Sequence, residues 1–361
     1  MTTTTDSAPA GAGDHRGRRA AGVIVAMGGG VAAFAIAGRS MLAQSTTTFA
    51  HLYWPWLALA IVAEAGSMAA FARTQRRVLR AGGTNVTLGS VMAVTYAGNA
   101  ISASLPLAGS ELATAFTFRQ FNRRGIDAAV AGWTLAVCGM YSSLGFALVL
   151  TGGAVASQSA AAAVLGCVGA AVSLAPTVAV LAALRFPRIR RALNHAFTRL
   201  VGATCRVIRR PGGGSQDALE RLLDRVAVLR LSRAQAAGIL ALATWNWVAD
   251  CLCLAATIKA TGTVVPWQGL FLAYGAGMAA ASFGLTPGGL GIVEATLSAA
   301  LVAAGISGHR ALAAVLVYRL ISFWLVMAAG WTVMAVMTRR ASPRETTANE
   351  WPERPDDHQI Q

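Results

Sequence analysis

Residues 281–291, with the sequence ASFGLTPGGLG, place a proline and several glycines inside an apolar stretch that is long enough to approach a bilayer span. Backbone groups that lose their helical hydrogen bonds at membrane depth are tolerated only where protein buries them or water reaches them. A broken helix at this position therefore predicts a binding site rather than a simple transmembrane span.

The composition is typical of a membrane protein. Hydrophobic residues make up 55% of the chain and charged residues 12%, with a mean hydropathy of +0.54, whereas an average soluble domain has about 25% charged residues. A spanning helix needs about 20 predominantly apolar residues. Apolar runs of about that length or slightly shorter occupy residues 22–42, 52–72, 88–105, 126–151, 160–184, 236–258, 269–285, 288–305 and 311–337.

The positive charge is unevenly distributed along the chain. The formal net charge is +15 with Lys259 as the only lysine, and arginines cluster in residues 16–19, 73–80, 119–124, 185–233 and 339–344. The positive-inside rule assigns these clusters to the cytoplasm, so we expect a prokaryotic inner-membrane protein with both termini cytoplasmic. Nucleic acid is not expected as a partner, because the basic residues lie between spans rather than on a soluble face.

This charge map predicts two re-entrant hairpins. The run 88–105 starts on the basic side, yet the next basic cluster follows after only residues 108–118, which cover roughly 16 Å, about half the hydrocarbon thickness. The same reasoning gives a second hairpin at residues 269–305, broken at 286–289. We predict an all-α, polytopic transmembrane helical bundle in which these two re-entrant hairpins oppose each other.

The two breaks also resemble each other locally. SLPLAGSEL at 104–112 and LTPGGLGIVEA at 285–295 share a proline, a following glycine and a glutamate, and opposed broken helices build the substrate site in inverted-repeat transporters. We expect Ser110 to cap one half-helix, and Thr286 with Pro287 to start the other. Such helix starts favour an anionic headgroup.

The chain resembles the transmembrane region of lysylphosphatidylglycerol synthases, which are flippase-like membrane proteins. The resemblance extends over residues 23–339 and rests on Asn99 with LPLAGSE and RQFNRRGI, on TPGGLGIVEATL, on ALAA at 311–314 and on YRLISFW at 318–324. It implies lipid translocation rather than lipid synthesis, since the soluble aminoacyl-transferase of some relatives is not found in these residues. Many relatives carry a basic residue near Glu111, which this chain lacks. The resemblance therefore does not predict which lipid this protein binds.

Ionisable residues fall within the apolar runs, where a charge at the bilayer centre costs about 2.5–3.5 kcal/mol even on the lenient insertion scale. They are Glu64, Glu111, Asp250, Glu294 and Arg319. We expect Glu294 and Arg319 to pair, because Arg offers planar donors that suit carboxylate or phosphate. The pair has either a functional or a purely structural role.

The functional prediction is a transporter that moves a phospholipid or lipid-linked headgroup between leaflets through a polar crevice at the two breaks. The alternatives are a membrane-embedded enzyme or enzyme subunit that modifies lipid headgroups, and a non-transporting scaffold. A homo-oligomer or a partner lipid-modifying enzyme stays open. The predicted substrate-binding residues are Asn99, Pro106, Gly109, Glu111, Thr286, Pro287, Gly288, Gly289, Glu294, Tyr318 and Arg319.

The remaining segments complete the predicted organisation. Residues 1–21 and 339–361 read as disordered cytoplasmic tails, around a transmembrane domain at 22–338. Within it, residues 186–235 read as an amphipathic cytoplasmic segment that binds anionic lipids or is only a basic linker. The dispersed cysteines and histidines show no metal-ligand spacing, and we predict no catalytic residues, metal or cofactor.

Overall fold

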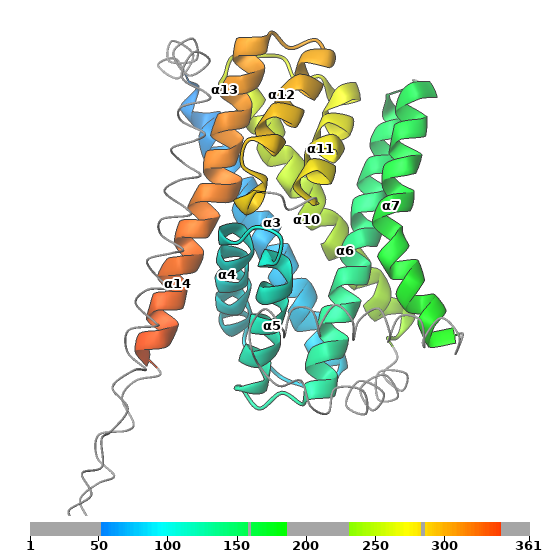
Figure 1. The fold of residues 1–361 in the computed structure, drawn as a ribbon, viewed down its shortest axis with the longest axis vertical. Helices are drawn as coiled ribbons and strands as arrows, with labels where there is room; N and C mark the ends of the chain where they lie inside the picture. Colours follow the sequence, from blue (N-terminus) through cyan, green and yellow to red (C-terminus); the bar gives the residue numbers. More distant parts are fainter. Residues whose placement is uncertain (1–51, 158–159, 186–230, 283–285, 341–361) are drawn as a thin grey trace, which may run out of the picture.

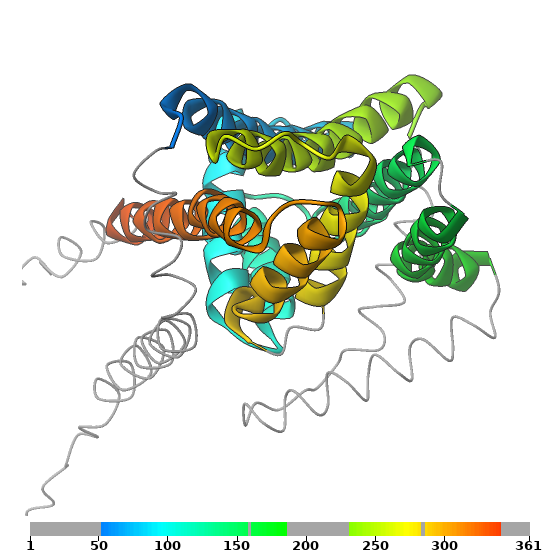
Figure 2. The same cartoon turned by 90° about the horizontal axis from the view of Figure 1, so that it is seen from above.

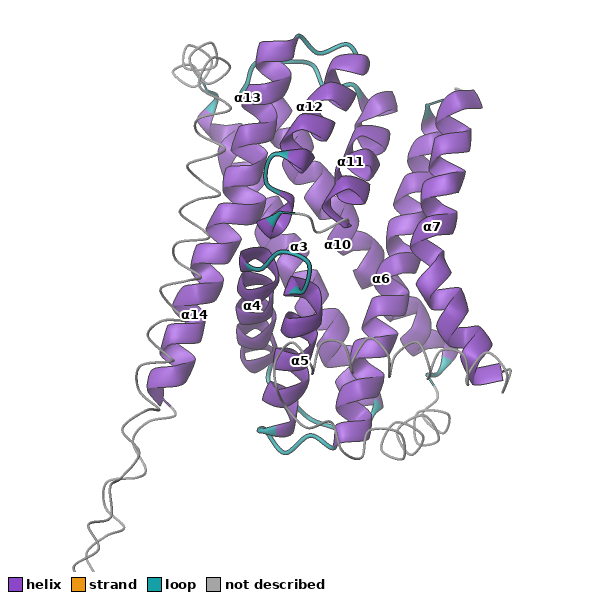
Figure 3. Cartoon of the chain, viewed as in Figure 1, coloured by secondary structure: helices purple, strands orange, loops and turns teal. Residues whose placement is uncertain are grey.

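The structure is a computed structural model that describes residues 52–157, 160–185, 231–282 and 286–340. Within these ranges the chain is helical, which confirms the all-α prediction (Figures 1 and 3). The predicted run at 22–42, both predicted tails apart from residues 339–340, and all but residues 231–235 of the amphipathic segment lie outside the described residues. The helices are α3 (Trp54–Ala81), α4 (Leu88–Ser104), α5 (Gly109–Asn122), α6 (Ala128–Ala156), α7 (Ala160–Arg185), α10 (Arg233–Ala260), α11 (Trp267–Ser282), η1 (Pro287–Gly289), α12 (Ile292–Ala303), α13 (Gly308–Arg319), η2 (Leu320–Leu325) and α14 (Val326–Arg340).

Long apolar helices form the frame of the bundle. Helices α3, α6 and α10, and the continuous rod of α13, η2 and α14, are each long and apolar enough to cross a membrane. Local signals set their starts: Asp127 accepts a hydrogen bond from the Ala129 amide at the start of α6, and Ser232 and Gln235 form a capping box at the start of α10. These caps satisfy amide groups that have no partner within the helix. The apolar runs predicted at these places are therefore helices of membrane-spanning length.

Two shorter helix pairs lie between the long helices. Helices α4 and α5, of 17 and 14 residues, pack together as one hairpin, and α11 and α12, of 16 and 12 residues, pack as the other. Figure 1 shows the hairpins entering from opposite ends of the bundle, with their connections facing each other at mid-height. Each of these helices is shorter than a full span of about 20 residues, with a length of roughly 60% to 85% of one.

The order of helix directions is inverted between the two halves of the chain. In Figure 1, α3 descends, α4 and α5 form a short hairpin and α6 ascends, whereas α10 ascends, α11 and α12 form a short hairpin and α13–α14 descends. The packing follows the same relation, since α4 contacts α14 as its counterpart α11 contacts α6. An inverted-topology repeat of this kind is the architecture that places a site between the two broken regions.

The described basic residues collect at one end of the bundle. Figure 1 places the end of α3, the end of α5, the start of α10 and the end of α14 at the bottom, and these termini carry Arg80, Arg119, Arg233 and Arg339. Lys259 and Arg310 lie at the opposite end, on α10 and α13. This distribution agrees with the predicted charge asymmetry along the membrane normal.

Close helix packing builds the core. Figure 2, a view from above, shows α3 and α10 side by side along one edge, with α11, α12 and α13 beside them. Small residues permit such contacts: a side chain at Gly330 of α14 would collide with the Tyr96 carbonyl oxygen of α4. Helices in lipid associate through this kind of small-residue contact.

We expect Gly330→Ala to destabilise the protein by about 1–3 kcal/mol, because the added methyl group overpacks the α4–α14 contact. The matched control is Gly66→Ala in α3, where an added Cβ meets no atom within 4 Å and the helix propensity of alanine is higher. Thermal unfolding of both variants in detergent is the measurement. Equal midpoints for the two variants would show that this contact does not stabilise the bundle.

Candidate functional site

The connections of the two hairpins meet around a cavity of about 520 Å³, which we call the polar chamber. Its walls come from α4, the 105–108 connection, the start of α5, the end of α11, η1, η2 and α14. Polar groups reach it from both hairpins, including Asn99 and Ser102 on one side and Ser282 and Thr286 on the other. Residues far apart in sequence therefore form one site at the place where both helices are broken.

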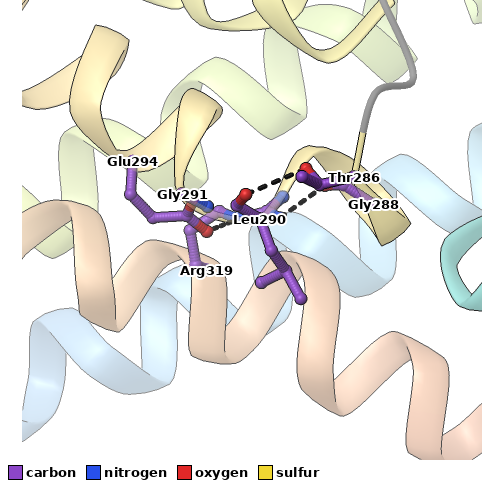
Figure 4. A network of polar contacts seen from close by, with 6 residues as sticks. All are labelled: Thr286, Gly288, Leu290, Gly291, Glu294 and Arg319. Carbon is purple, nitrogen blue, oxygen red and sulfur yellow. Dashed lines mark hydrogen bonds and ion pairs between the residues drawn. The ribbon is translucent and has the colours of Figure 1, made fainter. Parts of the chain in front are cut away.

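The α11–α12 break is held by a network of side-chain hydrogen bonds (Figure 4). Arg319 Nε donates to Glu294 Oε1 at 2.7 Å, and Arg319 Nη2 donates to the Gly288 carbonyl at 2.7 Å. Glu294 Oε2 accepts from the Gly291 amide at 2.6 Å, and the Thr286 hydroxyl donates to the Leu290 carbonyl at 2.9 Å. We call Glu294 and Arg319 the clamp, since together they join η1 and the start of α12 to α13.

Local geometry explains why these residue types occur at the break. Gly288, Gly289 and Gly291 all have positive φ, between 57° and 84°, a conformation that glycine adopts without steric cost. A side chain at Gly288 would also collide with the Phe323 ring. The break therefore needs glycine for both its backbone shape and its packing.

Arg319 is fixed from the other side by an irregular helix. It ends α13, and the next six residues form the π-helix η2, which breaks the regular helical hydrogen-bond pattern. The guanidinium lies 4.3 Å from the Phe323 ring centroid, a cation–π distance. With 7% exposure for Arg319 and 3% for Glu294, the pair is buried and hydrogen-bonded, as a charge inside a bundle must be.

The clamp confirms the predicted contact between Glu294 and Arg319, but neither side chain is among the residues lining the polar chamber. Two guanidinium nitrogens already donate to protein oxygens. In this conformation Arg319 acts as a positioning residue behind Gly288 and Phe323. A direct contact with lipid phosphate remains a prediction.

The α4–α5 break is held more loosely. Leu107 has a positive φ of 59° and is 73% exposed, and the Ala108 amide donates to the Pro106 carbonyl at 2.6 Å. A side chain at Gly109 would collide with the Ser102 carbonyl, so the glycine permits the tight approach of α5 to α4. The connection thus depends on backbone geometry rather than on a buried ion pair.

Two predicted helix caps are wrong in detail. Helix α5 starts at Gly109, and the Ser110 hydroxyl donates to Glu111 Oε2 at 3.1 Å instead of capping the helix. Thr286 and Pro287 start the short turn η1, while α12 itself begins at Ile292 after Gly291. The reason is that Thr286 uses its hydroxyl across the turn, on the Leu290 carbonyl.

Glu111 and Glu294 occupy corresponding places in the inverted repeat, as the third residues of α5 and α12. Their environments differ. Glu294 is buried against Arg319, whereas Glu111 is exposed, lines the polar chamber and is bonded by Ser110. When both partners are described residues, the structure shows one ion pair, which is the Glu294–Arg319 clamp. Glu111 therefore offers the chamber a carboxylate that no described cation neutralises.

A second cavity of about 960 Å³ adjoins the polar chamber, and its lining, which is mainly apolar by area, comes from α3, α4, α5, α6, α7, α10 and α11. Phe71, Leu135, Phe146, Val172 and Met278 are examples of that lining. The two cavities share Asn99, Ser102, Ser110 and Ser282. The site as a whole is therefore a polar compartment that shares a wall with an apolar one.

The predicted binding residues separate into two groups. Those that line the polar chamber are Asn99, Gly109, Glu111, Thr286, Gly288 and Gly289. Those that are not among its lining residues are Pro106, Pro287, Glu294, Tyr318 and Arg319.

Sequence reasoning missed the serines Ser102, Ser282 and Ser322 in the chamber wall. Serine is common in apolar helices, and only its position relative to a break could have identified these. The predicted binding residues also left out Asp250, which accepts hydrogen bonds from Tyr274 and Tyr318.

Fold and site together define a multi-pass helical membrane protein with a site at two opposed helix breaks. The chain matches the model of the family described as "Lysylphosphatidylglycerol synthase TM region" over residues 19–330. It therefore belongs to that family, as its motifs indicated, and is an integral membrane protein of a lipid-related family. A comparison with curated proteins gives no match.

A double-mutant cycle tests the clamp. We expect Arg319→Gln and Glu294→Gln each to lower the free energy of unfolding by about 3–5 kcal/mol, because each leaves a buried charge unpaired. The double variant should lose much less than the sum of the two singles. Unfolding of the four proteins in detergent measures this, and strictly additive losses would contradict an energetic coupling between the two residues.

Proposed function

We propose that this protein translocates a phospholipid or lipid-linked headgroup between the leaflets of a prokaryotic inner membrane. The observation that carries the proposal is the pair of neighbouring cavities with a shared wall, one polar and about 520 Å³, the other mainly apolar and about 960 Å³. An amphipathic substrate needs both environments at once. A water-soluble metabolite would not need the second.

The position of the polar chamber supports transport. The hairpins enter the bundle from opposite ends and their connections meet at mid-height (Figure 1), which in a re-entrant arrangement places the chamber near the bilayer midplane. Transporters with inverted repeats bind substrate at this depth and expose it to either side by moving one repeat against the other. A polar headgroup in the chamber is then shielded from hydrocarbon at the midplane of the bilayer, where its contact with lipid tails would cost the most free energy.

The residues of the chamber have separate roles in this proposal. Asn99, Ser102 and Thr286 offer hydrogen bonds to a headgroup, and Glu111 adds an acceptor with negative charge. The clamp keeps the α11–α12 break in shape, while the α4–α5 break, which has no buried ion pair among the described residues, is free to shift. The movable element is therefore the first hairpin.

The proposal is tested by reconstituting the purified protein into liposomes with a panel of fluorescent lipids that differ in headgroup, and scoring leaflet accessibility. We expect Ser282→Trp to slow translocation at least about tenfold, a barrier increase of about 1.4 kcal/mol, because the indole fills the border shared by both cavities. Leu320→Trp is the matched control, since Leu320 is 61% exposed on the outside of the bundle.

Two outcomes contradict the proposal. One is equal translocation by protein-containing and protein-free liposomes for every headgroup. The other is a chemically changed lipid in mass spectra of the recovered liposomes without leaflet exchange, which identifies an enzyme acting on headgroups instead.

A further inference from the structure

A second group of polar side chains lies apart from the polar chamber, and we call Glu64, Asp250, Tyr274 and Tyr318 the acid cluster. Each comes from a different helix: α3, α10, α11 and α13. The Tyr274 hydroxyl donates to Asp250 Oδ2 at 2.6 Å, and the Tyr318 hydroxyl donates to Asp250 Oδ1 at 2.9 Å. Glu64 and Asp250 lie on the packed helices α3 and α10, and their carboxyl groups are close enough to interact electrostatically.

Helix packing fixes this arrangement. Helices α3 and α10 run antiparallel along their length (Figure 1), and about one turn from the carboxyl pair the Asn246 side-chain amide donates to the Ser67 hydroxyl at 2.5 Å. This neighbouring bond sets the register of the two helices. The close approach of Glu64 to Asp250 is therefore a consequence of the core, not of mobile surface side chains.

One carboxylate oxygen of the acid cluster lacks a hydrogen-bond partner among the described residues. Glu64 is 5% exposed, and its Oε2 atom is buried with no hydrogen-bond donor. Both oxygens of Asp250 already accept from tyrosines. An ionised carboxylate only accepts hydrogen bonds, so two ionised carboxylates cannot bond each other. A proton on one of them supplies the missing donor.

The balance of buried charges also favours a proton on one of the two carboxyl groups. Arg319 is the cation nearest Asp250 along α13, and it is already paired with Glu294. The buried or partly buried groups Glu64, Asp250 and Glu294 thus face one arginine. Among the residues that the structure describes, the other titratable groups that interact with the pair or line its surroundings carry no positive charge: they are Tyr96 of α4, Cys251 and Cys253 of α10, Tyr274 of α11 and Tyr318 of α13.

We propose that Glu64 and Asp250 form a proton-binding site inside the membrane-spanning bundle and hold one exchangeable proton between them. Binding transfers a proton from water to a carboxylate oxygen and reduces the charge of the pair from −2 to −1. A buried carboxyl group can hold a proton at neutral pH because burial and a like charge both disfavour its ionised form. Two carboxyl groups that share a proton titrate as one coupled unit.

This site goes beyond lipid translocation and exists whether or not translocation occurs. Its link to the polar chamber is Tyr318, which bonds Asp250 and precedes Arg319 of the clamp in α13. Loss of the proton adds a negative charge beside Arg319, which competes with Glu294 for the guanidinium. Under the proposed function, the proton would change how firmly the clamp holds the α11–α12 break, and so make the wall of the polar chamber opposite the movable first hairpin sensitive to pH.

Infrared difference spectroscopy of the purified full chain tests the site without any lipid substrate. Dodecyl maltoside is a suitable detergent because it contains no carbonyl group. We expect a carboxylic acid carbonyl band at neutral pH that shifts to lower frequency in D₂O. Glu64→Gln should abolish the band, because the remaining Asp250 is stabilised as a carboxylate by two tyrosine donors.

Two further variants keep the test decisive. Asp127→Asn changes an exposed acid at the start of α6 and should leave the band unaltered, since asparagine also caps helices. Tyr318→Phe removes one hydrogen bond from Asp250 and should shift the band frequency even if Glu64→Gln does not fold.

Three results would overturn the proton site: no band in the wild-type protein at neutral pH, a band unchanged in both Glu64→Gln and Tyr318→Phe, or a band that is absent in sodium and appears only when choline replaces it. The last result would assign the carboxyl pair to a sodium ion. A failed liposome assay alone leaves the infrared result standing, so the two proposals fail separately.

Discussion

An unpaired backbone amide or carbonyl costs several kcal/mol in hydrocarbon, and the connection between α11 and α12 is where this chain has to meet that constraint. The helix is interrupted, yet its polar groups find partners within the protein. The Gly289 and Leu290 amides bond to the Thr286 and Pro287 carbonyls. Side chains bond three more backbone groups: Glu294 the Gly291 amide, Arg319 the Gly288 carbonyl, and the Thr286 hydroxyl the Leu290 carbonyl. The buried Glu294–Arg319 pair therefore supplies hydrogen bonds that the interrupted helix cannot make for its own backbone.

The two halves of the inverted repeat solve this problem differently. The α11–α12 break is closed by a charged pair, and a π-helix directs Arg319 and Phe323 toward it. The α4–α5 break keeps a more exposed connection, and its glutamate is left facing the polar chamber. In the proposed transport mechanism, the α11–α12 break would be the fixed wall of the site and the α4–α5 break the wall that moves.

Much of this organisation was predictable, and the reasons are physical. Pro287 and its neighbouring glycines mark a break in any apolar helix, and intramembrane charges are so rare that Glu294 and Arg319 were natural partners. What the linear pattern does not contain is the register between distant helices. The bond from Tyr318 to Asp250 and the contact of Glu64 with Asp250 depend on how α3, α10 and α13 align. The start of α5 at Gly109 similarly depends on the close Ser102 backbone, which no local cap rule includes.

The proposed lipid translocation requires both hairpin connections to lie deep in the bilayer. Cryo-electron microscopy of the protein in lipid nanodiscs measures this directly, because the disc boundary is visible beside the helices. Our account predicts that residues 105–108 and 286–291 both lie near the mid-plane of the disc, with the polar chamber between them. Connections at the disc surface, or hairpins outside the lipid, would contradict it.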